Sequence, residues 1–341
     1  FTKTFGTDNS QESLPDPRHL DPLFSEGYGM ALYWETLARW IPRRAHRDAL
    51  RCGVPLVFLQ AVDECNTLTE GGTSVAARRL LNVPNIHNTG HIHGVLPIHI
   101  GMEVRFTVKL NITLGLVQEQ RATVVGFVFS PEDQVRYDTL ARPGVLFRPH
   151  CCPAGIWLSV QDYNKNPLWQ DMMPYLADDE GTGTEGQRDA HVRAWRRECR
   201  ARGLLLYRPV VAEFTWRSST DHLVKRFGFP LTHAAYLTST ASQGQTLRTG
   251  TIIDCARVEQ QGQGRNGMSD DQWWLHLYVM FSRVTCMRHM LLLRPPPREL
   301  LERGPPAAAK AALEKFEHKK RGTQESALKA AAKFGIHVPP T

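Results

Sequence analysis

The order of apolar and polar residues predicts a chain in which short buried strands alternate with helices. Residues 27–50 place Leu32, Leu37, Trp40 and Ile41 on one face and arginines on the other, which is typical of an amphipathic helix. Short apolar runs predict buried strands, at 54–62, 204–216, 249–255 and 289–294.

A second region is richer in β-branched residues. Residues 96–129 are interrupted by Gly101 and Gly115, and they predict three or four short antiparallel strands that form a meander or a small barrel. Residues 131–187 contain many Pro, Gly and acidic residues and predict irregular structure. The following segment, 184–203, predicts an inserted basic helix.

The last third of the chain again alternates between helix and strand. Residues 233–243 have a helix-like pattern, and residues 269–284 predict an amphipathic helix that begins at Ser269. The tail from Pro305 is rich in Ala and Lys, which predicts helix with a break at Gly322. We therefore expect an α/β fold with a mainly parallel sheet, into which the antiparallel block is inserted.

Composition limits the class of protein. Hydrophobic residues make up 42% of the 341 residues, charged residues make up 22%, and no apolar run is long enough to predict a membrane-spanning helix. We expect no membrane partner. The seven cysteines are scattered and odd in number, which favours an intracellular, reducing compartment such as the nucleus or mitochondrion. The chain begins at Phe1 without a signal-peptide pattern, so we expect a fragment or a processed product.

The net charge of +7 is concentrated in three segments, at 32–51, 188–208 and 301–341. Basic segments of this kind bind phosphates in nucleic-acid-binding proteins, and they also occur as solvated helix surfaces. The sequence leaves both interpretations open.

Two polar features are candidates for binding chemistry. The segment Ser242–Thr246 lies between a helix-like run and an apolar strand, and Gly244 lets its backbone approach a ligand closely. Arg283 lies late in an apolar helix, where a guanidinium needs an anionic partner. That partner is either a nucleotide phosphate or a carboxylate of the same chain.

Three blocks together resemble superfamily 1 DNA helicases, and among them the RecD-like petite-integration-frequency group. "AYLTSTASQGQTL" is similar to motif V, "LYVMFSRV" is similar to motif VI, and residues 96–127 are similar to the inserted SH3-like barrel. The resemblance implies the second RecA-like domain, a P-loop-NTPase-type parallel sheet that lacks the P-loop itself. The implied organisation is an extended arm at 1–26, RecA-like segments at 27–95 and 229–300, a barrel at 96–228 with an irregular and basic helical insertion at 131–203, and a basic helical tail at 301–341.

The resemblance also implies roles for individual residues. Arg283 corresponds to the arginine finger that reaches the γ-phosphate, and Tyr278 and Ser282 are its supporting neighbours. The motif V residues correspond to contacts with nucleotide or DNA, and they are Thr238, Ser242, Gln243, Gly244 and Thr246.

The chain departs from the family pattern at two turns. Thr240 and Ala241 replace a His-Lys pair of motif V, and Gln118 and Glu119 stand where the barrel has an Asn-Gly turn. The change at Thr240 and Ala241 removes a basic contact with the DNA strand.

No phosphate-binding loop of the form G-x-x-x-x-G-K-[ST] occurs, and the chain contains no Gly-Lys pair. The resemblance therefore implies the C-terminal half of an ATP-dependent DNA helicase, with functions in DNA repair and recombination. ATP and Mg²⁺ are expected only together with the N-terminal RecA-like domain of the same protein. Single-stranded and forked DNA are the other expected partners. Two alternatives remain, a degenerate nucleic-acid-binding module without turnover and a structural interaction module.

Three weaker candidates lie outside these blocks. His87, His91 and His93 are close in sequence, which favours either a metal site or polar loop histidines. Trp273 and Trp274 are either core residues or platforms for stacked bases. The adjacent cysteines at 151 and 152 are expected to be free thiols.

Overall fold

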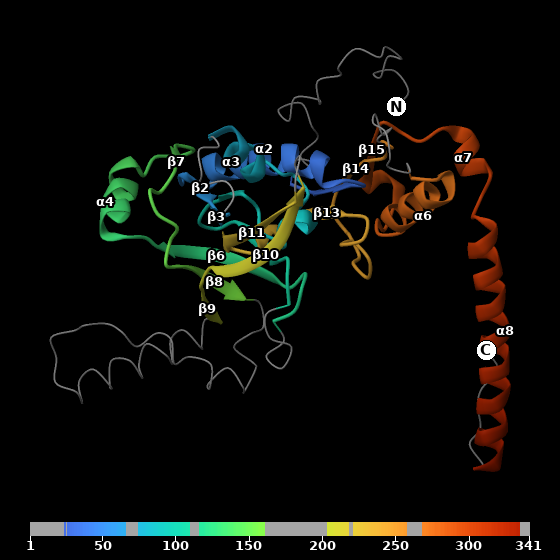
Figure 1. The fold of residues 1–341 in the computed structure, drawn as a ribbon. Helices are drawn as coiled ribbons and strands as arrows, with labels where there is room; N and C mark the ends of the chain where they lie inside the picture. Colours follow the sequence, from blue (N-terminus) through green and yellow to red (C-terminus); the bar gives the residue numbers. More distant parts are fainter. Residues whose placement is uncertain are drawn as a thin grey trace. The chain divides into compact units, whose positions relative to one another are not determined.

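The computed structural model describes residues 24, 26–65, 74–109, 116–160, 203–217, 221–257 and 268–334. The chain divides into two compact units, which we call the N-terminal unit (Gly27–Ala241) and the C-terminal unit (including Ser242–Thr341). Figure 1 shows their elements. The predicted arm at 1–26 and basic helix at 184–203 lie almost entirely outside the described residues. Within the described ranges, no helix combines the length and apolar character needed to cross a membrane.

The N-terminal unit begins with a strand and not with the predicted helix. β1 (Tyr28–Ala31) precedes α2 (Trp34–Cys52), which ends at Gly53 in the left-handed region with a φ of 72°. β1 pairs in parallel with β13 (Tyr236–Thr238). A side chain at Gly29 would approach the Tyr236 ring to 2.5 Å, so this pairing needs glycine there.

The helix predicted over residues 233–243 is wrong. β12 (Leu231–His233) pairs antiparallel with β5 (Glu103–Phe106), and β13 follows after a short turn. Residues 239–244 form turns. The neighbouring strands β5 and β1 supply hydrogen-bond partners for this backbone, and such tertiary pairing overrides local helix propensity.

A five-stranded antiparallel sheet has the order β12-β5-β6-β8-β9. The antiparallel strands predicted within residues 96–129 are therefore confirmed in part. β12 and β9 are the outer strands, and the pairings among the described residues do not close the predicted SH3-like barrel. The remaining strands of this sheet are β6 (Arg121–Val128), β8 (Gly155–Val160) and β9 (Leu204–Tyr207).

The irregular structure predicted over residues 131–187 is wrong for three segments, which are one helix and the strands β7 (Leu146–Phe147) and β8. α4 (Pro131–Leu140) begins at Ser130, whose hydroxyl accepts a hydrogen bond from the Asp133 N–H, and β8 occupies residues 155–160. Pro at the first helical position and acidic residues in the first turn are typical of a helix start. The proline and acidic residues that suggested a loop are therefore the residues with which this helix begins.

Two small three-stranded sheets complete this unit, with the orders β4-β2-β7 and β10-β11-β3. The strand predicted over residues 54–62 is confirmed as β2 followed by β3. The bounds of the strands are Leu56–Gln60 (β2), Val62–Glu64 (β3), Val95–Ile98 (β4), Leu146–Phe147 (β7), Val210–Arg217 (β10) and Asp221–Gly228 (β11). The short helices are α3 (Ser74–Leu81) and the 3₁₀ turn η2 (Ile86–Thr89).

The main apolar core of this unit lies between α2, the β2 sheet and the five-stranded sheet. Ala45 and Ala49 of α2 are fully buried with Val57, Ile98 and Phe106 in one cluster. This core holds β5 and β12 in place, and both strands lead to the residues described below.

The C-terminal unit contains the predicted parallel strands and helix. β14 (Thr251–Asp254) pairs in parallel with β15 (Met290–Leu293). α6 (Asp270–Phe281) begins with a capping box in which Ser269 and Gln272 satisfy each other's backbone N–H groups. The unit also contains η6 (Met287–His289), α7 (Arg298–Glu302) and α8 (Ala307–Lys333).

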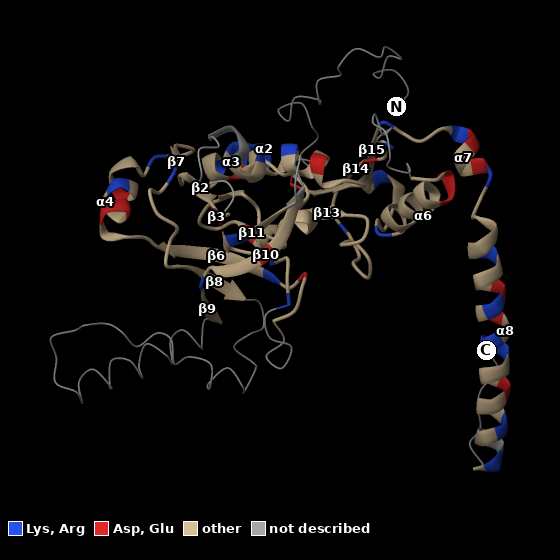
Figure 2. Ribbon diagram, viewed as in Figure 1, with Lys and Arg blue, Asp and Glu red and all other residues tan. Residues whose placement is uncertain are grey.

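The predicted break at Gly322 is wrong, because α8 continues through it (Figure 1). A glycine within a helix costs only about 1 kcal/mol relative to alanine, and the neighbouring Ala, Lys and Glu residues favour helix. The Thr323 and Ser326 hydroxyls also donate hydrogen bonds to helix carbonyls at Lys319 and Gly322. Lys, Arg and Glu residues are interspersed along its length (Figure 2).

Candidate functional site

The predicted motif V residues fall on both sides of the boundary between the two units. Thr238 ends β13 and is buried, and its hydroxyl accepts a hydrogen bond from the Ala241 N–H at 3.2 Å. The backbone of Ser242 accepts a hydrogen bond from the Gln245 N–H at 3.1 Å, which closes a turn. Gly244 occupies the middle of this turn with a φ of 76°.

The side of this turn that is exposed carries polar groups. Gln243, Gly244 and Thr246 are exposed, and a Cβ at Gly244 would meet nothing within 4 Å. Glycine is therefore favoured here by its positive φ and not by crowding. A turn with an open backbone and exposed hydroxyl and amide groups suits contact with a polar ligand.

Arg283 follows the end of α6 and is half-buried. Its guanidinium donates to the carbonyl of Val279 at 3.2 Å, to the hydroxyl of Ser282 at 2.9 Å and to the carbonyl of Gln245 at 3.4 Å. Among the described residues it forms no ion pair with a carboxylate. The salt-bridge alternative for this arginine is therefore not seen in the part of the chain that the structure describes.

The backbone also joins Arg283 to the end of the motif V turn. The Leu247 N–H donates to the Arg283 carbonyl at 2.8 Å, and the Thr285 N–H donates to the Leu247 carbonyl at 3.3 Å. Leu247 and Val284 form an isolated parallel bridge. The two blocks, nearly forty residues apart in sequence, are thus held together by both backbone and side-chain bonds.

The two predicted supporting residues differ in their contacts. Ser282 ends α6 and contacts the guanidinium of Arg283 directly. The ring of Tyr278 is 57% exposed and stacks on Trp274 with a centroid separation of 5.5 Å. Tyr278 contributes its backbone carbonyl, which accepts a hydrogen bond from the Ser282 N–H.

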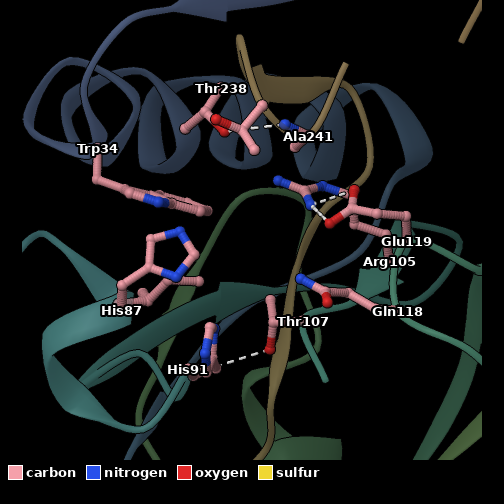
Figure 3. A pocket seen from close by; sticks show the side chains of 11 residues that line it. Trp34, His87, His91, Arg105, Thr107, Gln118, Glu119, Thr238 and Ala241 are labelled. Atoms are coloured by element: carbon pink, nitrogen blue, oxygen red, sulfur yellow. Dashed lines mark hydrogen bonds and ion pairs between the residues drawn. The ribbon is translucent and has the colours of Figure 1, made fainter. Parts of the chain in front are cut away.

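The N-terminal unit contains a cavity of about 230 Å³. Figure 3 shows Trp34 and His87 on one side of it and Arg105 and Glu119 on the other. The lining residues come from α2, η2, β5, β13 and the connecting loops, and they are Trp34, Ile86, His87, His91, Arg105, Thr107, Gln118, Glu119, Thr238, Thr240 and Ala241.

An ion pair forms one wall of this cavity. The guanidinium Nη1 of Arg105 contacts both carboxylate oxygens of Glu119 at 2.5 Å, and Nη2 donates to the carbonyl of Tyr236 at 3.1 Å. Arg105 is 2% exposed, so a carboxylate partner is needed to keep its charge there. Burial raises the pKa of Glu119, and the Arg105 guanidinium opposes this shift.

The histidines of the cavity are held neutral. Burial lowers the pKa of His91. Burial, and after it the proximity of His91 and of Arg105, lowers the pKa of His87. The rings of His87 and His91 are edge to face, with centroids 4.8 Å apart.

The structure gives no support to the metal-site alternative for these histidines. His93 contacts the hydroxyl of Thr232 at 3.0 Å, and His91 has left-handed backbone geometry with a φ of 65°. No group of three or more potential ligands capable of holding a metal ion occurs in the described ranges.

The sequence interpretation missed Trp34 and Arg105, and it named Glu119 only as part of a turn that departs from the family pattern. The signal for Arg105 is its place in the alternating run of β5, where an arginine falls between apolar residues. Glu119 has a φ of 70°, so a non-glycine residue occupies a left-handed turn position. Its ion pair with Arg105 offers a reason for glutamate there.

The comparisons with known proteins give only distant likenesses. No protein-family model matches the chain, and no curated protein matches it. The structure of the Pif1 helicase from Candida albicans is similar with a TM-score of 0.38 and 16% identity, over 81% of this chain and 48% of that chain. The Pif1 helicase from Bacteroides in complex with ADP-AlF3 and single-stranded DNA is similar with a TM-score of 0.43 and 12% identity, over 92% of this chain and 48% of that chain.

A further structure, Bacteroides Pif1 bound to single-stranded DNA, has a TM-score of 0.42 and 12% identity, over 87% of this chain and 46% of that chain. The chain spans about half the length of these solved structures. At identities and TM-scores this low, the likeness does not assign the chain to a family.

Proposed function

We propose that this chain is the C-terminal portion of an ATP-dependent DNA helicase, which couples ATP hydrolysis to movement along single-stranded DNA and to duplex unwinding. Arg283 is the proposed arginine finger, supported by Ser282 and Tyr278. The proposed contacts with nucleotide or DNA are Thr238, Ser242, Gln243, Gly244 and Thr246. Support comes from the three sequence blocks, which occur in the order that the resemblance requires.

One observation carries this proposal. The guanidinium of Arg283 is held by the oxygens of Val279, Ser282 and Gln245, which are all uncharged, and it has no carboxylate partner among the described residues. Its positive charge is thus oriented but not neutralised. A fixed and unneutralised guanidinium stabilises negative charge that develops on a transferring phosphoryl group.

The residues present fit one side of an ATP site only. Arg283 and the motif V turn offer hydrogen-bond donors, whereas the 341 residues contain no phosphate loop and no Gly-Lys pair. ATP and Mg²⁺ would therefore be held chiefly by an N-terminal RecA-like domain of the same protein. On its own the chain is expected to hydrolyse no ATP.

A second candidate function is nucleic-acid binding without turnover. It is favoured by Thr240 and Ala241, which replace the two basic residues of the family motif V. Thr240 is exposed and offers only a neutral hydroxyl. This candidate keeps the strand contacts and gives Arg283 no catalytic role.

The test is an arginine replacement in a protein in which the chain is joined to a RecA-like domain that carries a phosphate loop. Arg283→Ala is expected to lower the turnover number by about a thousandfold or more, because an arginine finger acts mainly on the transition state. Nucleotide affinity should change little. Arg283→Lys should not restore turnover, because an ammonium group lacks the planar fork of donors.

The matched control is Arg288→Ala, which removes an exposed arginine of the same unit. It should leave turnover unchanged. Equal rates for the Arg283→Ala variant and the unmodified protein would rule out the arginine finger and leave the second candidate function.

A further inference from the structure

The cavity of the N-terminal unit is close to electrically neutral. The charge of Arg105 is balanced by Glu119, and burial lowers the pKa values of His87 and His91, so both rings are neutral near pH 7. The other lining groups are hydroxyl, amide and apolar. The cavity is therefore suited to an uncharged polar group and poorly suited to a free phosphate.

Unpaired polar atoms gather around this cavity. Eight buried side-chain nitrogen or oxygen atoms lack a hydrogen-bond partner among the described residues, and three of the eight belong to its lining, namely Trp34 Nε1, His91 Nδ1 and Arg105 Nε. A buried donor without a partner costs about 1–3 kcal/mol. Their concentration at one cavity points to a ligand that offers hydrogen-bond acceptors.

The shape of the cavity favours a flat ring. Trp34 and His87 face Arg105 and Glu119 across it, and Thr238 and Thr107 lie at its other margins (Figure 3). Its volume is about 230 Å³. An apolar cavity of roughly 150 Å³ accommodates benzene, so this cavity has room for one heteroaromatic base.

Entry is from a polar rim. His87, Gln118 and Thr240 are exposed, whereas Trp34 and Arg105 at the base of the cavity are 5% and 2% exposed. The rim includes Thr240 and Ala241, which lie two and three residues after the proposed strand contact Thr238. A strand that contacts Thr238 is thus brought next to the opening.

We infer that this cavity receives one base of a single-stranded nucleic acid and prefers a base with a ring carbonyl next to a ring N–H. Guanine and thymine share this edge. The inference rests on the proposed function only in that the chain must contact a nucleic-acid strand.

The preference follows from the groups at the base of the cavity. A carbonyl oxygen has two lone pairs, so it can accept from both Trp34 Nε1 and Arg105 Nε, whereas a ring nitrogen has one. The Arg105 Cζ lies 5.9 Å from the centroid of the Trp34 ring. The two side chains are therefore direct neighbours in the wall of the cavity. Both nitrogens are covered in the structure, so side chains at the base of the cavity must move before a base can reach them.

The Glu119 carboxylate supplies the acceptor for the ring N–H of the base. Glu119 contacts Arg105 through both oxygens, and each oxygen keeps a lone pair for a further donor. The ring N–H of guanine or thymine is such a donor. Cytosine and adenine have at this place a ring nitrogen with a lone pair, which a carboxylate repels.

The experiment measures fluorescence anisotropy of the whole chain with labelled 12-nucleotide strands. Each strand is oligo(dA) with one central position that carries thymine, guanine, cytosine or adenine. Thymine or guanine should bind about tenfold more tightly than cytosine or adenine, the discrimination expected of one well-formed pair of hydrogen bonds. The affinities of the thymine and guanine strands show which of these two bases the cavity binds more tightly.

Two variants test the site itself. Trp34→Phe removes the indole donor and keeps a ring, and Ala241→Leu narrows the cavity from its rim. Both should abolish the preference for the central base and leave the salt dependence of binding unchanged, because that dependence reports phosphate contacts. Trp157→Phe on β8 is the matched control, since Trp157 does not line the cavity, and it should keep the preference. Circular dichroism confirms that each variant is folded.

The outcomes separate the inference from the proposed function. Equal affinity for all four strands, with binding that weakens as salt rises, would overturn the inference and leave the DNA contact intact. A preference that survives both variants would also overturn it. No binding at low salt would overturn both the inference and the DNA contact of the proposed function.

Discussion

The two units use arginine in different ways. In the N-terminal unit, Arg226 is fully buried and its guanidinium contacts both carboxylate oxygens of Asp63, at 2.6 and 2.7 Å. Arg105 is also paired with a carboxylate, because its Nη1 contacts both oxygens of Glu119. In the C-terminal unit, Arg283 is half-buried and contacts only uncharged oxygens among the described residues.

This difference separates arginines that a carboxylate neutralises within the fold from one that has no such partner among the described residues. A fully buried guanidinium without a carboxylate would carry a desolvation cost of several kcal/mol, so Arg226 and Arg105 need their partners. A half-exposed guanidinium keeps part of its hydration and can remain unneutralised at a small cost. Arg283 can therefore keep its charge without a carboxylate from the described residues.

The largest expected effect is a contrast in stability between two arginine variants. Arg226→Ala leaves Asp63 without its partner and also removes donors to the carbonyls of Ile92 and Leu80. We expect the free energy of unfolding to fall by about 3–5 kcal/mol. Arg283→Ala should lower it by about 1 kcal/mol, because it removes neutral hydrogen bonds from a half-buried residue and leaves no carboxylate unpaired. Urea unfolding followed by tryptophan fluorescence measures both.

Asp63→Asn is the companion variant for this contrast. It leaves Arg226 buried and unneutralised, so its loss of stability should be similar to that of Arg226→Ala. A large loss for Arg283→Ala would mean that this arginine is structural, and the distinction between the two units would then fail.

The second contrast concerns pH. Burial, and after it the charges of Arg105 and Arg226, lowers the pKa of His93 to about 4. Burial also lowers the pKa values of His87, His91, His99 and His233 in the N-terminal unit, whereas only His276 shows this shift among the described histidines of the C-terminal unit.

These shifts fix the sign of the pH dependence. Below pH 6.5 the unfolded chain binds protons that the folded His93 does not, so stability falls as pH drops from 6.5 towards 4 and rises again as pH is restored. For His93 alone the loss is about 2–3 kcal/mol. Urea unfolding at pH 7, 6, 5 and 4.5 measures it, and His93→Gln should flatten the curve. An equally steep curve for this variant would show that His93 does not contribute.

The sequence predicted the elements whose own pattern decides their structure. The capped helix from Ser269, the strand at 249–255 and the strand at 54–62 all have local signals that agree with their environment. The pairing of β13 with β1 overrode the helix-like pattern of residues 233–243, because a distant strand supplied the hydrogen bonds. Local propensity contains no information about such a partner.

The candidate site was predictable to a similar extent. The resemblance drew attention to Arg283 and to the motif V turn, and the structure holds these two segments together through Leu247 and Gln245. Their roles stay predictions. The cavity beside Trp34 brings together residues more than two hundred positions apart in sequence, from Trp34 to Ala241, and no local pattern marks such a group.

The smallest expected effect concerns α8. The helix has 27 residues, and Leu313, Phe316 and Leu328 are each more than half exposed, so it has no buried apolar face in the structure. Removing residues 307–341 deletes almost no core contact among the residues that the structure describes. We therefore expect the midpoint of thermal unfolding to change by less than about 2 °C, whereas the helical circular dichroism signal should fall, because a long Ala- and Lys-rich segment forms helix largely by itself. A control deletion of residues 298–341 also removes buried Leu300 of α7 and should lower the midpoint measurably. If the shorter deletion destabilised the chain as much as the longer one, α8 would have to pack against the protein in solution. The contrast between a tightly packed N-terminal unit and a solvated C-terminal helix would then need revision.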